Sequence, residues 1–113
     1  MADPRVEYDA VAEELSATSP AVRGMMFGMP CLKQGGKAFA GFFRDAMVFK
    51  LTGAAHREAL ELSGSHPFDP MEMGRPMKEW VVVPGEHAAR WLALTRAAQQ
   101  YVVGKTEPPG KRR

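Results

Sequence analysis

Residues 25–51, MMFGMPCLKQGGKAFAGFFRDAMVFKL, decide the fold that this sequence predicts. The apolar residues of this stretch follow a period of two, which is typical of strands with one buried face. Gly35-Gly36 is a two-residue hairpin signal, and Arg44-Asp45 suits a second tight turn. The stretch therefore predicts three consecutive antiparallel strands.

The two turns also predict which residues face each other. Extending the pairing outward from each turn places Ala40 opposite Cys31 on one neighbouring strand and opposite Phe49 on the other. One sheet face then carries an apolar set made of Met29, Cys31, Ala40, Phe42, Met47, Phe49 and Leu51. The opposite face carries Leu32, Phe39, Gly41, Phe43, Val48 and Lys50. Because the first face is uniformly apolar, we expect it to be the core.

Helices are predicted before and after these strands. Asp3 followed by Pro4 is a helix start, because an N-cap acceptor precedes a proline at the first helical position. Helical spacing continues through the apolar stripe of Tyr8, Val11, Ala12 and Leu15. Ser19-Pro20 ends this helix, since the residue before a proline avoids the helical region. Thr52 is placed to cap a second helix that ends near Ser63-Gly64.

The second half of the chain begins with a proline-rich segment. Residues 65–78 hold three prolines and a glycine and predict a long ordered loop with, at most, a short strand. Residues 79–83 predict a strand that Pro84-Gly85 stops, with Trp80 and Val82 on one side of it. A last helix over about 86–103 carries the apolar stripe Trp91, Leu94, Thr95, Ala98, Tyr101 and Val102.

The order of these elements, α-βββ-α-ββ-α, predicts the fold class. It is a two-layer α+β domain in which a mainly antiparallel sheet packs on helices. We expect residues 1–104 to form one domain, because 113 residues are too few for two cores. Residues 105–113 follow as a basic tail that we expect to be disordered.

Composition narrows the function classes. The net charge is +2, and three basic residues, Lys111, Arg112 and Arg113, belong to the tail. The body is therefore near neutral, which argues against a strong phosphate-binding surface. The single cysteine, Cys31, excludes an internal disulfide and suits a reducing cytosol. The acidic, polar N-terminus and the lack of an apolar run of about 20 residues predict a cytoplasmic protein without a membrane anchor.

Residues that often carry chemistry do not form a diagnostic pattern. His56, His66 and His87 lack a second ligand at metal-binding spacing, and Cys31 falls on the apolar face, where a thiol is inert. The loop HPFDPMEMGRPM, residues 66–77, holds both carboxylates and methionines, but neither set has the spacing of a metal site. There is no glycine-rich phosphate motif and no GxSxG elbow. We therefore expect no cofactor, no metal and no catalytic residues.

The segment GRPMKEWVVVP, residues 74–84, contains two candidate anion contacts, Arg75 and Lys78. Both flank the entry to the last strand and could bind a nucleic-acid phosphate together with the basic tail. The alternative is that they pair with nearby carboxylates, namely Asp69, Glu72 or Glu79.

Four segments together resemble a known family. MFGMPCLKQGGKAFAGFF, MVFKL, HPFDP and GRPMKEWVVVP occur in this order and precede a helix that contains tryptophan. In this respect the chain, from about residue 8 to 103, resembles the N-terminal domain of the TfoX/Sxy family. The resemblance implies the α-βββ-α-ββ-α fold, without catalytic residues or a known small-molecule ligand. Members that also carry a C-terminal helical domain regulate natural competence in bacteria with the cyclic-AMP receptor protein, and this sequence resembles the stand-alone version.

Two functions remain open at this point. The first is a non-enzymatic regulatory module that binds protein, with a second copy of itself as one partner. The alternative is an accessory domain that binds nucleic acid through Arg75, Lys78 and the tail. The sheet face opposite the expected core favours the first, because Leu32, Phe39, Phe43 and Val48 are too apolar to face water. We expect a homodimer that buries this face, with Phe39 and Phe43 near its centre.

Overall fold

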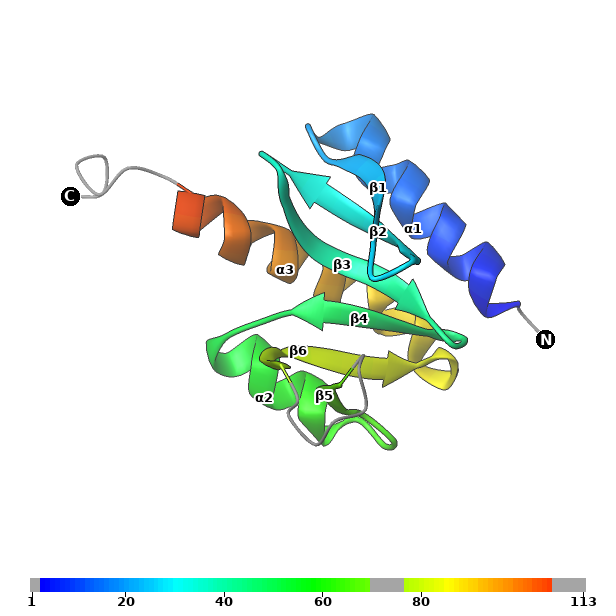
Figure 1. Ribbon diagram of the computed structural model, residues 1–113. Coiled ribbons are helices and arrows are strands. Elements are labelled where there is room, and N and C mark those ends of the chain that lie inside the picture. The colour runs from blue at the N-terminus through cyan, green and yellow to red at the C-terminus, as the bar shows by residue number, and fades with distance from the viewer. Residues whose placement is uncertain (1–2, 70–76, 107–113) are drawn as a thin grey trace.

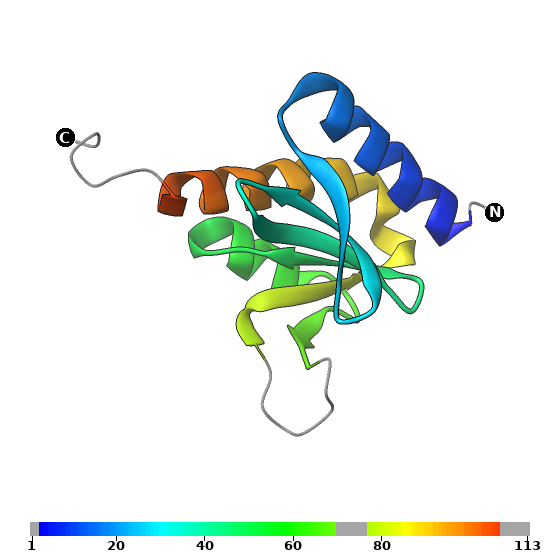
Figure 2. The ribbon, with the colours of Figure 1, turned by 45° about the horizontal axis from the view of Figure 1, so that its top comes forward.

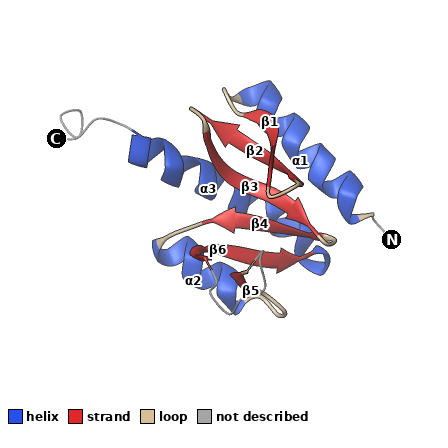
Figure 3. Cartoon of the chain, viewed as in Figure 1, coloured by secondary structure: helices blue, strands red, loops and turns tan. Residues whose placement is uncertain are grey.

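The computed structural model describes residues 3–69 and 77–106 and shows a six-stranded antiparallel sheet packed on helices (Figures 1 and 3). The elements in chain order are α1 (Pro4–Thr18), β1 (Val22–Met26), β2 (Met29–Gln34), β3 (Lys37–Phe43), β4 (Ala46–Lys50), α2 (Gly53–Glu61), β5 (His66–Phe68), β6 (Met77–Pro84), the 3-10 helix η1 (Gly85–Arg90) and α3 (Trp91–Thr106). The strands lie in the order β1-β2-β3-β4-β6-β5. This confirms the predicted two-layer α+β fold class.

Helix α1 begins and ends where the sequence predicts. The Asp3 carboxylate accepts a hydrogen bond from the Arg5 backbone N–H at 2.9 Å, and Pro4 opens the first turn. The apolar stripe is buried, and its residues are Tyr8, Val11, Ala12 and Leu15. At the other end, the Ser19 hydroxyl donates to the Leu15 carbonyl at 2.7 Å, which closes the last turn. Both ends are determined by local chemistry.

The region after α1 contains four strands, one more than predicted. The additional strand, β1, pairs with β2 through a two-residue turn at Phe27-Gly28. Both turn residues have positive φ, 50° for Phe27 and 74° for Gly28, as a tight hairpin turn requires. The period-two pattern in the sequence begins only at Met25, so it does not predict most of β1.

A β-bulge changes the predicted face assignment. Next to the Gly35-Gly36 turn, Gln34 opposes Lys37 as expected, but the register shifts between Leu32 and Lys33. Phe39 is the extra residue on β3, since Ala38 pairs with Lys33 and Ala40 with Leu32. Every β2 residue beyond the bulge therefore changes sides relative to the prediction. Cys31 lies opposite Gly41 and not, as predicted, opposite Ala40.

All three helices bury apolar residues against one face of the sheet (Figure 2). This helix-covered core has contributions from strands, helices and connections. The strand residues are Leu32, Phe39, Ala40, Met47, Phe49, Val81 and Val83, the helix residues are Tyr8, Val11, Ala12, Leu15, Ala59, Trp91, Leu94, Ala98 and Val102, and the connections add Ala21 and Leu51. The prediction of Ala40, Met47, Phe49 and Leu51 as core residues is thus confirmed. For Leu32 and Phe39, which were expected on the opposite face, it is wrong because of the bulge.

The opposite face has its own apolar cluster, and no described helix covers it. This second cluster consists of Met29, Ala46, Val48, Phe68, Trp80 and Val82. Trp80 and Val82 lie there while Val81 and Val83 face the helices, as the alternation along β6 predicts. Gly41 is in close contact with this cluster, because a Cβ at that position would lie 2.7 Å from the Met29 Cε. We call this side of the sheet the uncovered face.

Candidate interaction surface

Aromatic rings form a chain across the uncovered face. Phe68, on β5, is buried and lies at the centre of this chain. Its ring centroid is 5.1 Å from that of Phe43, 6.5 Å from that of Phe27 and 6.5 Å from that of Trp80. Edge contacts of this kind are favourable beyond the apolar area that they bury. Phe68 therefore fixes β5 on the sheet, while Phe43 is half-buried and Phe27 exposed.

A hollow of about 460 Å³ opens on the same face, beside the turn between β3 and β4. Its lining residues are Phe43, Arg44, Asp45, Ala46, His66, Val82 and Pro84. The Arg44 guanidinium lies 4.8 Å from the centroid of the Phe43 ring, at cation–π distance. The His66 Nδ1 is 3.1 Å from the Gly64 carbonyl oxygen. The hollow thus has an apolar floor and a rim of one cation, one carboxylate and one imidazole.

The Arg44-Asp45 turn beside this hollow has an unfavourable backbone conformation. Arg44 has φ 50° and Asp45 has φ 65°, and both residues carry a Cβ. A left-handed conformation costs a residue with a side chain about 1–2 kcal/mol, although aspartate tolerates it better than most. A two-residue hairpin with a type I′ turn has positive φ at both positions, so the short connection between β3 and β4 imposes it here.

Replacing Asp45 by glycine is expected to raise the free energy of unfolding by about 1 kcal/mol, because glycine adopts positive φ without steric cost. Chemical denaturation of the wild type and of Asp45→Gly measures this difference. Asp45→Ala is the matched control, since alanine also removes the carboxylate but keeps the Cβ, and it should not stabilise the protein. Equal stabilisation by both variants would show that the carboxylate, and not the backbone, is unfavourable at this turn.

Exposed apolar side chains concentrate at the β1 edge of the sheet. Among the described residues five large apolar side chains are exposed, and three of them lie on β1 or its turn. These three are Val22, Met25 and Phe27, which we call the β1 patch, and they are 57%, 59% and 59% exposed. The other two, Val6 and Leu92, lie on helices. Isolated apolar residues on a surface are ordinary, but three on one edge strand and its turn make a candidate contact surface.

Two side chains with potential catalytic chemistry, those of Cys31 and His87, have structural surroundings. Cys31 is a free, buried cysteine, and burial raises the pKa of its thiol. The His87 Nε2 lies 2.8 Å from the Ser63 carbonyl oxygen and so connects η1 to the end of α2. Over residues 3–69 and 77–106, no three His, Cys, Asp or Glu side chains come together in a way that could hold a metal ion. Nor does any helix in these ranges have the length and apolar character needed to cross a membrane.

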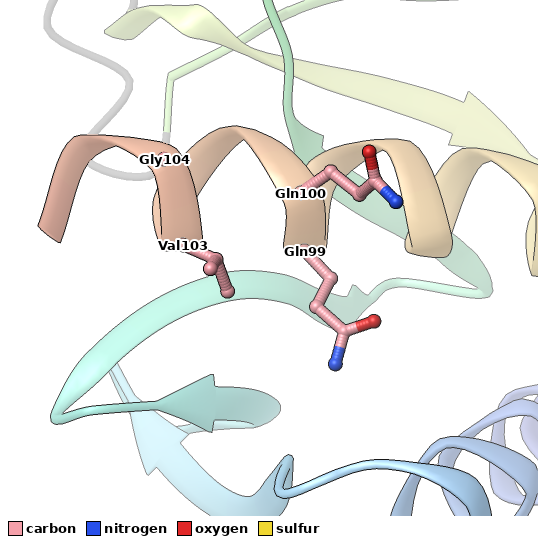
Figure 4. Close-up of a pocket in the computed structure, with 4 residues that line it drawn as sticks. All are labelled: Gln99, Gln100, Val103 and Gly104. Atoms are coloured by element: carbon pink, nitrogen blue, oxygen red, sulfur yellow. The ribbon is translucent and has the colours of Figure 1, made fainter. Parts of the chain in front are cut away.

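A second hollow, of about 350 Å³, lies beside the C-terminal half of α3 and is lined by Gln99, Gln100, Val103 and Gly104 (Figure 4). Gln99 and Val103 project from the same side of the helix, toward the strands (Figure 4). The Gln99 amide nitrogen donates to the Ser19 hydroxyl at 2.9 Å and to the Gln34 side-chain oxygen at 2.8 Å. These bonds join α3 to the end of α1 and to β2. The Gln99 side chain therefore has a structural role in holding these elements together.

The residues predicted as an interaction surface do not lie together. Leu32 and Phe39 are fully buried beneath the helices, so Phe39 does not lie at the centre of an exposed face. Val48 is on the uncovered face but is also fully buried. Of the four residues, only Phe43 is partly accessible there. The prediction that Leu32 and Phe39 lie on an exposed face is therefore wrong, and the cause is again the bulge at Phe39.

The predicted anion contacts fall mostly outside the described residues. Arg75, Lys111, Arg112 and Arg113 lie outside the described residues. Lys78 lies in strand β6. Glu79, one of the carboxylates considered as their partner, has other contacts. Its carboxylate accepts a hydrogen bond from the Tyr101 hydroxyl and lies 3.9 Å from the Lys50 Nζ.

The β1 patch was missed in the sequence although it has a recognisable signal. Residues 22–26, VRGMM, precede Phe27-Gly28, a pair whose glycine suits the second position of a tight turn. Its exposure cannot be read from the sequence, because the apolar residues of an edge strand resemble those of a central one.

Three comparisons with known proteins were made, against protein-family models, curated proteins and solved structures, and none of them returns a match.

Proposed function

We propose that this chain is a regulatory protein-interaction module of the TfoX/Sxy N-terminal-domain type, which acts in the cytoplasm and associates with itself. The observation that carries the proposal is the β1 patch. Its three exposed apolar side chains lie at one edge of the sheet, while the helix-covered core is complete without them. Burying such a patch against another protein removes apolar surface from water, which favours association.

The charges near the patch are consistent with a protein partner. Arg23, the one charged residue of β1, donates a hydrogen bond to the Asp9 carboxylate at 2.6 Å. This bond holds the pKa of Asp9 below its ordinary value, because the guanidinium of Arg23 stabilises the ionised carboxylate. A surface that binds nucleic acid would instead present cations that no carboxylate compensates. The proposal assigns no catalytic residue and no cofactor.

Self-association is tested by the mass of the protein in solution. Multi-angle light scattering on the wild type, from low to high micromolar concentration, should show twice the mass of one chain. The double variant Met25→Ser with Phe27→Ser should show the mass of one chain, with unchanged far-UV circular dichroism. Val6→Ser is the matched control, because Val6 is 60% exposed but lies on α1, and it should remain dimeric. A wild type that stays monomeric at the highest concentration would refute self-association.

A further inference from the structure

The two edges of the sheet differ in their protection against pairing with another strand. At one edge, β5 has three residues, with Pro67 at its centre and an irregular register against β6. Proline, bulges and short length are the devices by which proteins block edge pairing. At the other edge, β1 has five residues and pairs with β2 without a break. It contains no proline or lysine, and its one charged residue, Arg23, is bonded to Asp9 of its own chain, so β1 is the less protected edge.

The hairpin determines which backbone groups β1 presents outward. In a hairpin with a two-residue turn, the residues that flank the turn, here Met26 and Met29, exchange backbone hydrogen bonds. Bonding then alternates along the strand, so Gly24 and Val22 also bond to β2. The N–H and C=O groups of Arg23 and Met25 consequently point away from the sheet. These groups are available to a further strand.

We propose that β1 pairs antiparallel with β1 of a second copy, about a two-fold axis at Gly24, so that one sheet continues through both copies. This inference rests on the proposed self-association and assigns it an interface. In this register Arg23 lies opposite Met25 of the second copy, and the outward groups form roughly four hydrogen bonds. On the uncovered face, Val22 lies opposite Met26 of the second copy. The pairing thus covers exposed Val22 with Met26 of the second copy on the uncovered face, and exposed Met25 with the Arg23 side chain of the second copy on the other side of the joined sheet.

Charge and turn geometry select this register from its neighbours. A shift toward the N-terminus would place Arg23 opposite Arg23 of the second copy, and like charges directly opposite are destabilising. A shift toward the C-terminus would require Arg23 to pair with Phe27, whose φ of 50° belongs to the turn and not to a strand. In the proposed register Arg23 keeps its own partner, Asp9, and meets an apolar side chain. The partner that best matches the edge of β1 is therefore β1 itself.

A proline substitution tests the backbone pairing. Met25→Pro removes an outward N–H and leaves the pairing with β2 intact, since proline is tolerated on an edge strand where its nitrogen faces solvent. We expect Met25→Pro to be folded and to have half the wild-type mass in light scattering. Met25→Ala, which keeps the N–H, is the matched control and should still form the dimer. A dimeric Met25→Pro would overturn the inference.

Cysteine cross-linking tests the register and does not depend on the proline variant. The cross-linking variant is Gly24→Cys in a Cys31→Ala background. In the proposed dimer, position 24 of one copy lies opposite position 24 of the second copy in a non-hydrogen-bonded pair, with Cα atoms about 4.5 Å apart. Oxidation should convert this variant to a covalent dimer. Val22→Cys in the same background is the control, because its two copies would be offset by about 13 Å along the strands. The Val22→Cys variant should therefore not cross-link.

The outcomes distinguish this inference from the proposed function. If the wild type is a dimer but Gly24→Cys does not cross-link and Met25→Pro remains dimeric, the edge pairing is wrong while self-association stands. If the wild type is monomeric, both are wrong. Cross-linking of Val22→Cys in place of Gly24→Cys would overturn the register and with it the axis at Gly24.

Discussion

Replacing Trp80 by alanine is expected to lower the free energy of unfolding by about 3–5 kcal/mol. The Trp80 side chain is only 6% exposed and belongs to the cluster on the uncovered face. Its ring lies 6.5 Å from that of Phe68, so the indole supports β5 as well as its own strand, β6. Removing it leaves a large gap beside Phe68 in the cluster on the uncovered face. The loss should therefore reach the upper part of the range for core substitutions.

Urea or guanidinium denaturation of the wild type and of Trp80→Ala measures this loss. Trp80→Phe is the conservative control, since it keeps an aromatic ring beside Phe68 and should cost clearly less. Arg57→Ala, at an exposed position on α2, should change the stability by less than about 0.5 kcal/mol. If Trp80→Ala were as mild as Arg57→Ala, the cluster on the uncovered face would not contribute to stability.

Elements with strong local signals were predicted well. Helix α1 has a cap, a proline at its first position and a regular apolar stripe, and the structure confirms all three. The alternation in β6 assigned Trp80 and Val82 to one face and Val81 and Val83 to the other, which is also confirmed. In both cases the information lies within a few residues of the chain. Such signals survive in the folded protein because they do not depend on distant contacts.

The faces of β2 could not be predicted in the same way. The predicted faces depend on counting residue pairs outward from the Gly35-Gly36 turn. One extra residue on β3 reverses the face assigned to every β2 residue farther from the turn. The pair Phe43–Ala46 at the other turn has no such interruption, and there the predicted register is confirmed as far as Ala40–Phe49. A bulge has only a weak sequence signal, because it is stabilised by packing. Here the packing is that of Phe39 among the helices.

The candidate interaction surface was harder to predict than the fold. Apolar side chains such as Leu32 and Met25 look alike in the sequence, yet the first is fully buried and the second 59% exposed. The difference arises because Leu32 lies beneath the helices, whereas Met25 lies on the outermost strand. The position of a strand at the edge of a sheet depends on how all six strands are ordered. The order β1-β2-β3-β4-β6-β5 is thus the information that the local sequence pattern does not contain.

Phe39→Ala and Phe43→Ala should differ strongly in their effect on stability. The two residues lie on the same strand and would share a face if β3 were regular. Because of the bulge, Phe39 is fully buried in the helix-covered core, where truncation should cost about 3–5 kcal/mol. Phe43 is half-buried on the uncovered face, with the Phe68 ring on one side and the Arg44 guanidinium 4.8 Å from its own ring. Its truncation leaves a smaller, open gap and should cost about half as much.

The same pair of variants also separates stability from association. Phe39 lies beneath the helices and Phe43 lies beside the β3–β4 turn, whereas the proposed interface is on β1. Both variants should therefore remain dimeric under conditions in which they are folded, as measured by light scattering. Equal losses of stability, or a larger loss for Phe43→Ala, would mean that β3 is regular and that Phe39 faces away from the helices. A folded but monomeric Phe43→Ala would instead return the interface to the uncovered face, where the sequence had placed it, because only there can this side chain contact a second copy.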